Sequence, residues 1–77
     1  MKIEILGTGC SKCEALFNNA KQAAGKAGYA FSQIEKVEDL QKIMEYGVMS
    51  TPGLVIDGEV KSTGKVLSVD EIVALIQ

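Results

Sequence analysis

The chain contains two cysteines, Cys10 and Cys13, separated by two residues within the segment GTGCSKC (residues 7–13). Two thiols at this spacing can form a reversible disulfide, hold a soft metal ion as thiolates, or close a short structural loop. A disulfide across so short a loop constrains the unfolded chain little, contributing about 2 kcal/mol in the chain-entropy model. We therefore expect the pair to serve redox chemistry or metal binding rather than stability.

The composition is typical of a small globular protein without a strong charge bias. The 77 residues are 47% hydrophobic and 23% charged, with a net charge of −2, and we expect residues 1–77 to form one domain because the chain is too short for a second core. Lysines and acids are interleaved, which argues against nucleic-acid and membrane partners. The first residues, MKIEIL, lack a signal-peptide pattern. We expect a cytoplasmic monomer, in a compartment where ordinary thiols stay reduced.

Periodicity in the first half of the chain predicts the elements that must position the cysteines. A first strand covers Lys2–Leu6, and a helix follows from about Ser11 to Lys26. The apolar residues of this helix recur at the spacing of one buried face: Cys13, Leu16, Phe17, Ala20, Ala24 and Ala27. A second strand is expected over Tyr29–Lys36, where polar and apolar residues partly alternate.

The next segments predict a short helix and a hairpin. The helix covers roughly Glu38–Tyr46 and ends at Gly47. Its inward residues are expected to be Leu40, Ile43 and Met44. A strand through residues 54–56 then turns at Asp57-Gly58 into a strand through Val60, which is a strong hairpin signal.

A capping box at residues 68–71 (SVDE) predicts the start of a last helix. The residues that this helix should bury are Ile72, Val73, Leu75 and Ile76. The predicted order of elements is therefore β-α-β-α-β-β-α, an α/β fold.

The predicted elements place Cys10 where the first strand meets the first helix. Backbone N–H groups and the positive end of the helix dipole stabilise an anion there, and Lys12 adds a positive charge, so the pKa of Cys10 should be lowered. A capping box of Ser11 and Glu14 would start the helix one residue later, with Cys10 still beside these N–H groups. Cys13 lies one turn into the helix on its apolar face and should be buried. An exposed, acidified thiol beside a sheltered one is the arrangement that disulfide exchange needs.

The segments GTGCSKC and YGVMSTPGLVIDGEV (residues 46–60) resemble the thioredoxin superfamily. The chain is more closely similar, over essentially its whole length, to the short prokaryotic thioredoxin/glutaredoxin-like proteins called redox-active disulfide proteins. The resemblance implies a minimal thioredoxin-like fold, with a mixed four-stranded sheet flanked by three helices.

The resemblance also implies a thiol-disulfide oxidoreductase that acts on protein disulfides. Cys10 would be the nucleophile and Cys13 the resolving thiol, with no cofactor beyond the redox-active Cys10–Cys13 disulfide. An unidentified reductant, either thioredoxin-reductase-like or glutathione, would restore the dithiol. The Thr51-Pro52 bond would be cis and would place the Thr51 backbone against the disulfide, where it pairs with a substrate strand.

Two departures from the common thioredoxin pattern lie around the cysteines. No tryptophan precedes Cys10, and Ser11-Lys12 replaces Gly-Pro between the cysteines, so the redox potential of thioredoxin does not transfer. Glu4 precedes Cys10 at a spacing comparable to that of the buried acid of thioredoxins, and as such it would accept a proton from Cys13. We instead expect Glu4 to be an exposed strand residue, because buried carboxylates are rare.

A soft-metal module is the alternative function. GTGCSKC also resembles the GxTCxxC loop of small heavy-metal-transfer domains, in which two thiolates bind Cu(I) or Zn. Two features argue against this alternative: Gly9 separates Thr8 from Cys10, and the predicted order ends on a helix rather than a strand. With no histidine and two cysteines, the chain also lacks the four soft ligands of a closed zinc site.

Overall fold

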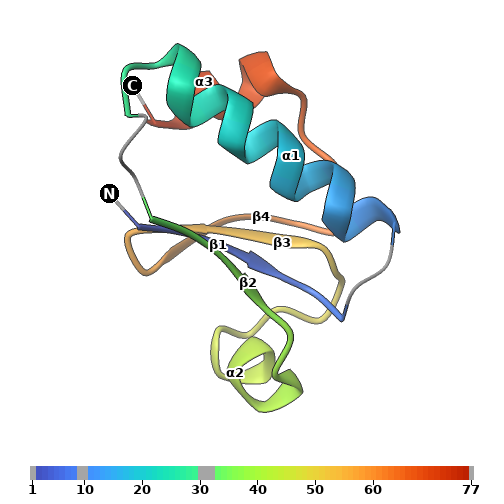
Figure 1. Cartoon of the computed structure of the whole chain (residues 1–77). Helices are drawn as coiled ribbons and strands as arrows, with labels where there is room; N and C mark the ends of the chain where they lie inside the picture. The colour runs from blue at the N-terminus through green and yellow to red at the C-terminus, as the bar shows by residue number, and fades with distance from the viewer. Residues whose placement is uncertain (1, 9–10, 30–32, 77) are drawn as a thin grey trace.

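The computed structural model describes residues 2–8, 11–29 and 33–76 of the chain. Its strands are β1 (Lys2–Leu6), β2 (Gln33–Val37), β3 (Gly53–Ile56) and β4 (Glu59–Thr63). Its helices are α1 (Ser11–Lys26), α2 (Leu40–Glu45) and α3 (Val69–Ile76), and none of the described helices is long and apolar enough to cross a membrane. The order of elements confirms the predicted α/β fold, with four strands and three helices (Figure 1).

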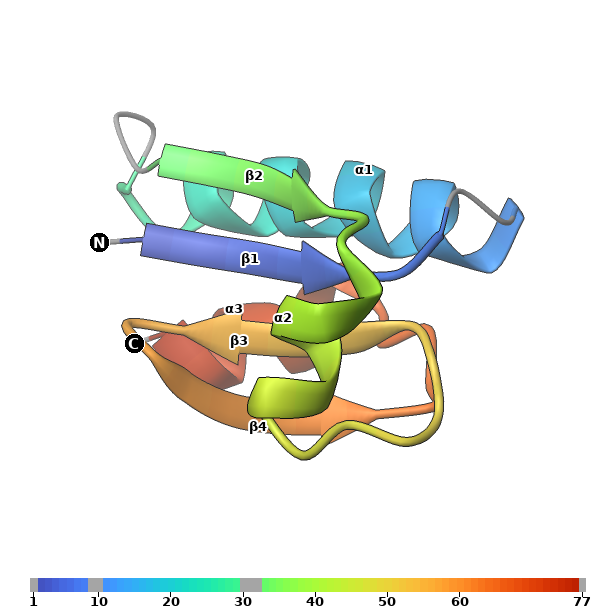
Figure 2. The ribbon, with the colours of Figure 1, turned by 90° about the horizontal axis from the view of Figure 1, so that it is seen from below.

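The four strands form one mixed sheet in the order β2-β1-β3-β4 (Figure 2). β1 runs parallel to β2, as expected when α1 provides the crossover, and antiparallel to β3. β3 and β4 are joined by the predicted two-residue turn. Asp57 has a φ of 50° and Gly58 a φ of 82°, which are the left-handed conformations that this kind of hairpin turn requires.

The helices lie on both faces of the sheet. α1 and α3 cover one face, and α2 crosses the other (Figures 1 and 2). The larger apolar cluster lies between the sheet and α1 and α3, and its largest buried members include Ile3, Ile5, Leu16, Leu54 and Ile72. The smaller cluster lies on the side of α2 and consists of Leu6, Val37, Ile43, Val48 and Val55. β1 is therefore a central strand that is covered on both faces.

The second strand differs from its predicted bounds at both ends. The Tyr29 N–H donates a 2.7 Å hydrogen bond to the carbonyl of Ala24, so Tyr29 belongs to the turn that closes α1 rather than to a strand. The preceding residue, Gly28, has a φ of 86°, which ends the helix. β2 extends one residue beyond the prediction, to Val37, because its register with Leu6 continues to the end of β1. Residues 30–32 of the predicted strand lie outside the described part of the chain.

Three residues that were expected to point inward are exposed. Leu40 is 62% and Met44 74% exposed, and Ile43 is the one residue of α2 that is buried. A six-residue helix that crosses a sheet presents little more than one turn to it, so its other apolar side chains stay in solvent. In α3, Ile72 and Ile76 are buried at the i, i+4 spacing, whereas Leu75 is partly exposed and lines an open hollow together with Lys61 of β4 and Leu67.

Candidate active site

The first turn of α1 places Cys13 directly beneath the end of β1. The side chain of Cys13 is 5% exposed and shares the buried face of the helix with Leu16, as predicted. A Cβ atom built on Gly7 would overlap the Cys13 Sγ atom and would lie 3.3 Å from the Cys13 Cβ. The sulfur therefore packs against the backbone of residue 7, and a glycine is needed there for this close approach.

The loop that enters β3 meets the same point. The Thr51-Pro52 peptide bond is cis, Pro52 is fully buried, and Thr51 is exposed. The Cβ built on Gly7 would lie 3.8 Å from the Cβ of Thr51. The structure thus brings Thr51 next to Cys13 on one side of Gly7, although Thr51 is distant from the other two residues in the chain.

The residues between the cysteines begin α1. Ser11 is the first residue of the helix and Lys12 the second, and both are exposed. Ser11 thus lies within the helix and is not its N-cap. The alternative in which a capping box of Ser11 and Glu14 starts the helix one residue later is therefore wrong. Gly9 and Cys10 lie outside the described residues. The role of Cys10 as the exposed nucleophile therefore stays a prediction.

The exposed side of the first turn of α1 is tied to β2, which the sequence did not indicate. The Lys36 ammonium forms an ion pair with the Glu14 carboxylate, and it lies 4.8 Å from the centre of the Phe17 ring. The Gly7 N–H donates a 3.0 Å hydrogen bond to the Val37 carbonyl at the end of the same strand. These contacts hold the helix that carries Cys13 against the edge of the sheet.

Glu4 is buried, and the prediction that it is exposed is wrong. Glu4 is 8% exposed, and its Oε1 atom accepts a 2.9 Å hydrogen bond from the Tyr46 hydroxyl. Ile3 and Ile5 pack with the residues of α1. Because successive strand residues point to opposite faces, Glu4 points to the side of α2. Cys13 lies on the α1 side, so the structure does not support Glu4 as the direct proton acceptor of Cys13.

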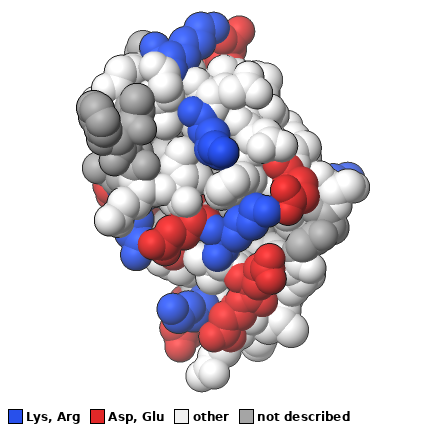
Figure 3. Space-filling view, in the orientation of Figure 1, with Lys and Arg blue, Asp and Glu red and all other residues white. Residues whose placement is uncertain are grey.

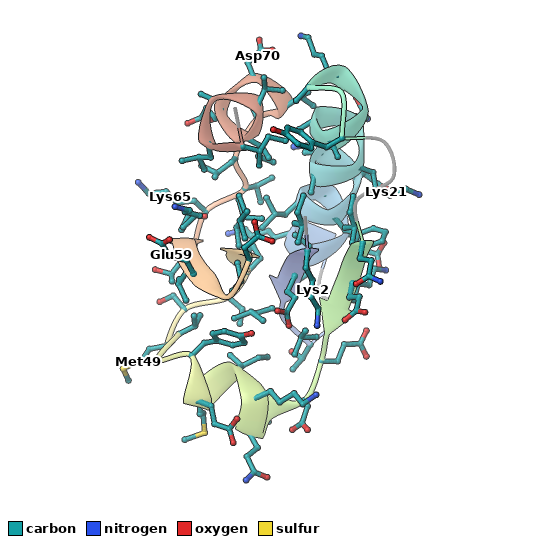
Figure 4. All side chains as sticks on the ribbon, turned by 90° about the vertical axis from the view of Figure 1, so that its left-hand side faces the viewer. Lys2, Lys21, Met49, Glu59, Lys65 and Asp70 are labelled. Atoms are coloured by element: carbon teal, nitrogen blue, oxygen red, sulfur yellow. The ribbon has the colours of Figure 1, made fainter. Side chains whose placement is uncertain are left out.

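The hydrogen bond to Glu4 also alters the acidity of Tyr46. It raises the pKa of the phenol above its ordinary value, and desolvation and the negative charges of Glu4 and Glu45 act in the same direction. The two residues line an open hollow of about 300 Å³ together with Lys2, Lys42 and Glu45. Lys2 is labelled on this side of the molecule in Figure 4. No pattern in the sequence indicated this pair, because its members are 42 residues apart.

A second, apolar hollow opens beside Thr51. It has a volume of about 550 Å³ and is lined by Thr8, Leu40, Ile43, Met44, Gly47, Val48, Met49 and Thr51. None of these side chains is charged. Met49 is 97% exposed and projects outward from the loop that follows α2 (Figure 4). This surface was not predicted, because Leu40 and Met44 have the residue types and spacing of core residues.

Across residues 2–8, 11–29 and 33–76, no group of three or more His, Cys, Asp or Glu side chains is placed to hold a metal ion. Opposite charges are mixed over the face shown in Figure 3, without a large area of one sign.

The mixed sheet, the helix that carries a buried cysteine and the proline loop beside it define a thioredoxin-like protein. The family model for the thioredoxin domain matches residues 1–77. The chain is 43% identical over 72 residues to the thioredoxin of Methanothermobacter thermautotrophicus, covering 94% of this chain and 92% of that protein. It is 41% identical over 70 residues to the thioredoxin of Methanocaldococcus jannaschii, covering 91% and 79%. The chain belongs to the thioredoxin family, and it is a thiol-disulfide oxidoreductase.

Proposed function

We propose that the protein exchanges disulfides with protein substrates through Cys10 and Cys13 and needs no cofactor beyond this couple. The Cys10 thiolate attacks a substrate disulfide, forms a mixed disulfide and releases one substrate thiolate. Cys13 then attacks the Cys10 sulfur, which releases the second substrate thiol and leaves a Cys10–Cys13 disulfide. A reductant, either thioredoxin-reductase-like or glutathione, returns the two electrons.

The observation that carries this proposal is the placement of Cys13. A resolving thiol should be shielded from external reagents and should still lie within one helical turn of the nucleophile. Cys13 is buried against Gly7 at the start of α1, and it is three residues after Cys10 in the sequence.

Thr51, Pro52, Ser11 and Lys12 have supporting roles in this proposal. Thr51 is exposed beside Gly7, where its backbone would pair with an extended substrate, and the buried Pro52 would hold that loop in place. Ser11 and Lys12 lie in the exposed first turn of α1. There the Lys12 charge would favour the thiolate of Cys10.

Two cysteine variants test the proposal in an insulin-reduction assay, with dithiothreitol, glutathione or thioredoxin reductase as the electron donor. Cys10→Ser should be inactive. Cys13→Ser should accumulate mixed disulfides with the substrate, visible as a larger species on non-reducing gels. Asn18→Ala, an exposed change further along α1, is the control and should retain turnover. Turnover by Cys10→Ser would contradict the proposal, and tight Cu(I) binding without turnover by the parent would favour the metal alternative.

A further inference from the structure

Two methionines form much of the exposed wall of the apolar hollow beside Thr51. Met44 is 74% and Met49 97% exposed, and both line the hollow together with Thr8 and Thr51. A thioether in solvent is open to oxidation, and the resulting sulfoxide is polar where the methionine was apolar and flexible. The same side chains are well suited to adaptable apolar binding surfaces. Oxidation would therefore make this wall of the hollow polar and would leave the packing of the core unchanged.

We propose that Met44 and Met49 are an oxidation site that controls docking of protein substrates. A hydroperoxide converts each thioether into a sulfoxide, and this weakens binding of the substrate while the cysteine chemistry continues. In each step the methionine sulfur loses two electrons and gains a bond to oxygen. The O–O bond of the hydroperoxide breaks at the same time, and the peroxide is reduced to water or an alcohol. This inference rests on the proposed exchange with protein disulfides.

The occupant of the hollow is an extended, apolar segment of the substrate next to its disulfide. The hollow is continuous with the site of exchange, since Thr51 lines it and also lies beside Gly7 and Cys13. All of its lining side chains are uncharged, so an apolar segment is desolvated there with little loss of polar contacts. A charged or strongly polar segment would lose hydration without gaining partners.

Methionine oxidation can be separated from cysteine oxidation because different reductants reverse the two. Thiol reductants reduce disulfides, whereas methionine sulfoxide is returned to methionine by dedicated reductases. When the cysteines are first oxidised to the disulfide, which protects them, treatment with hydrogen peroxide and then with dithiothreitol should therefore give reduced cysteines and oxidised methionines. Peptide mass spectrometry should locate one added oxygen at each of Met44 and Met49.

The decisive measurement is kcat/KM for two substrates before and after this treatment. For insulin, kcat/KM should fall about tenfold, the scale expected when contacts worth about two buried methylenes are lost. For hydroxyethyl disulfide, which is too small to fill the hollow, it should stay unchanged. In the double variant Met44→Leu with Met49→Leu, treated and untreated protein should have equal values for insulin.

A methionine placed elsewhere provides the matched control. Leu75 is exposed on α3 and is not part of the hollow, so Leu75→Met in the double variant adds an oxidisable thioether at a distant site. Its oxidation should not change insulin turnover. Met49→Leu alone repeats the test with a single exposed substitution, and its treated protein should lose less activity than the treated parent.

Three results would overturn the proposal. The first is unchanged insulin turnover by the doubly oxidised parent. The second is an equal loss with both substrates, which would place the damage at the cysteines. The third is an equal loss in the double leucine variant. Failure of the proposed function itself is recognised separately, because untreated protein would then reduce neither substrate.

Discussion

The Tyr46 hydroxyl donates a 2.9 Å hydrogen bond to the Glu4 carboxylate and so joins the end of α2 to the middle of β1. β1 leads directly to Gly7, against which Cys13 packs, and α2 supplies Ile43 and Met44 to the apolar hollow. The bond therefore links the strand below the exchange site to the helix that lines the proposed docking surface. It also accounts for a buried carboxylate in a small core, since Glu4 has a donor within reach.

The first prediction concerns the titration of Tyr46. In a Tyr29→Phe background, absorbance titration should give a Tyr46 pKa above the ordinary value of about 10. Ionisation would remove the proton that Tyr46 donates to Glu4, and it would also bring a second negative charge beside that carboxylate. Glu4→Gln keeps an acceptor and removes the charge, so it should lower the pKa. The contribution of the pair to stability should be complete below about pH 10 and should be lost as pH rises through the raised pKa. An unchanged titration in Glu4→Gln would contradict this account.

The second prediction concerns the contact between Gly7 and Cys13. Gly7→Ala should lower the free energy of unfolding by about 1–3 kcal/mol, because the added Cβ would overlap the Cys13 sulfur. Turnover of insulin should fall as Cys13 is displaced. Gly25→Ala is the matched control. It lies in α1 with open space around it, and it should raise stability by about 0.5–1 kcal/mol. Denaturant unfolding measures both, and equal effects would exclude a close contact at Gly7.

The third prediction concerns the exposed charge between the cysteines. Lys12→Glu should slow alkylation of Cys10 at neutral pH, because a positive charge that favours the thiolate is replaced by a negative one. The effect should shrink at high salt, since solvent-exposed charges are screened. Lys21→Glu, further along α1, should have a much smaller effect. A rate change that is independent of salt would contradict an effect of the exposed Lys12 charge through solvent.

The fourth prediction concerns the start of α3. The Glu71 N–H donates to the Ser68 hydroxyl at 3.2 Å, and the Ser68 N–H donates to the Glu71 carboxylate at 3.0 Å, which confirms the predicted capping box. Ser68→Ala should cost about 1 kcal/mol of stability near neutral pH.

The pH dependence of the capping box follows from the pKa of Glu71, which hydrogen bonds from the Ser68 backbone N–H and the Ser68 side chain lower. The stabilisation should be present above the unfolded pKa of about 4.3 and lost as pH falls through the lower folded value. Glu71→Gln removes the titrating carboxylate and keeps the backbone donor of residue 68, so the stability difference between the parent and Glu71→Gln should be smaller near pH 2 than at pH 7 in urea unfolding. A difference that is constant with pH would show that the carboxylate does not take part.

The sequence alone determined the features that depend on neighbouring residues. The burial of Cys13 followed from the 3.6-residue period of α1, the β3–β4 turn from Asp57-Gly58, and the start of α3 from the capping box. Each of these rests on contacts across a few residues, so residue type and spacing are sufficient to predict it.

The tertiary structure decided which face of each element is covered. Glu4 is buried because α2 lies over its face of a central strand and Tyr46 reaches it from 42 residues away. Leu40 and Met44 have the residue types of a core and are exposed, because so short a helix covers the sheet with little more than one turn. The meeting of Cys13, Gly7 and Thr51 likewise depends on the pairing of β1 with β3. Burial depends on the packing of distant segments, and the pattern within one segment does not contain that information.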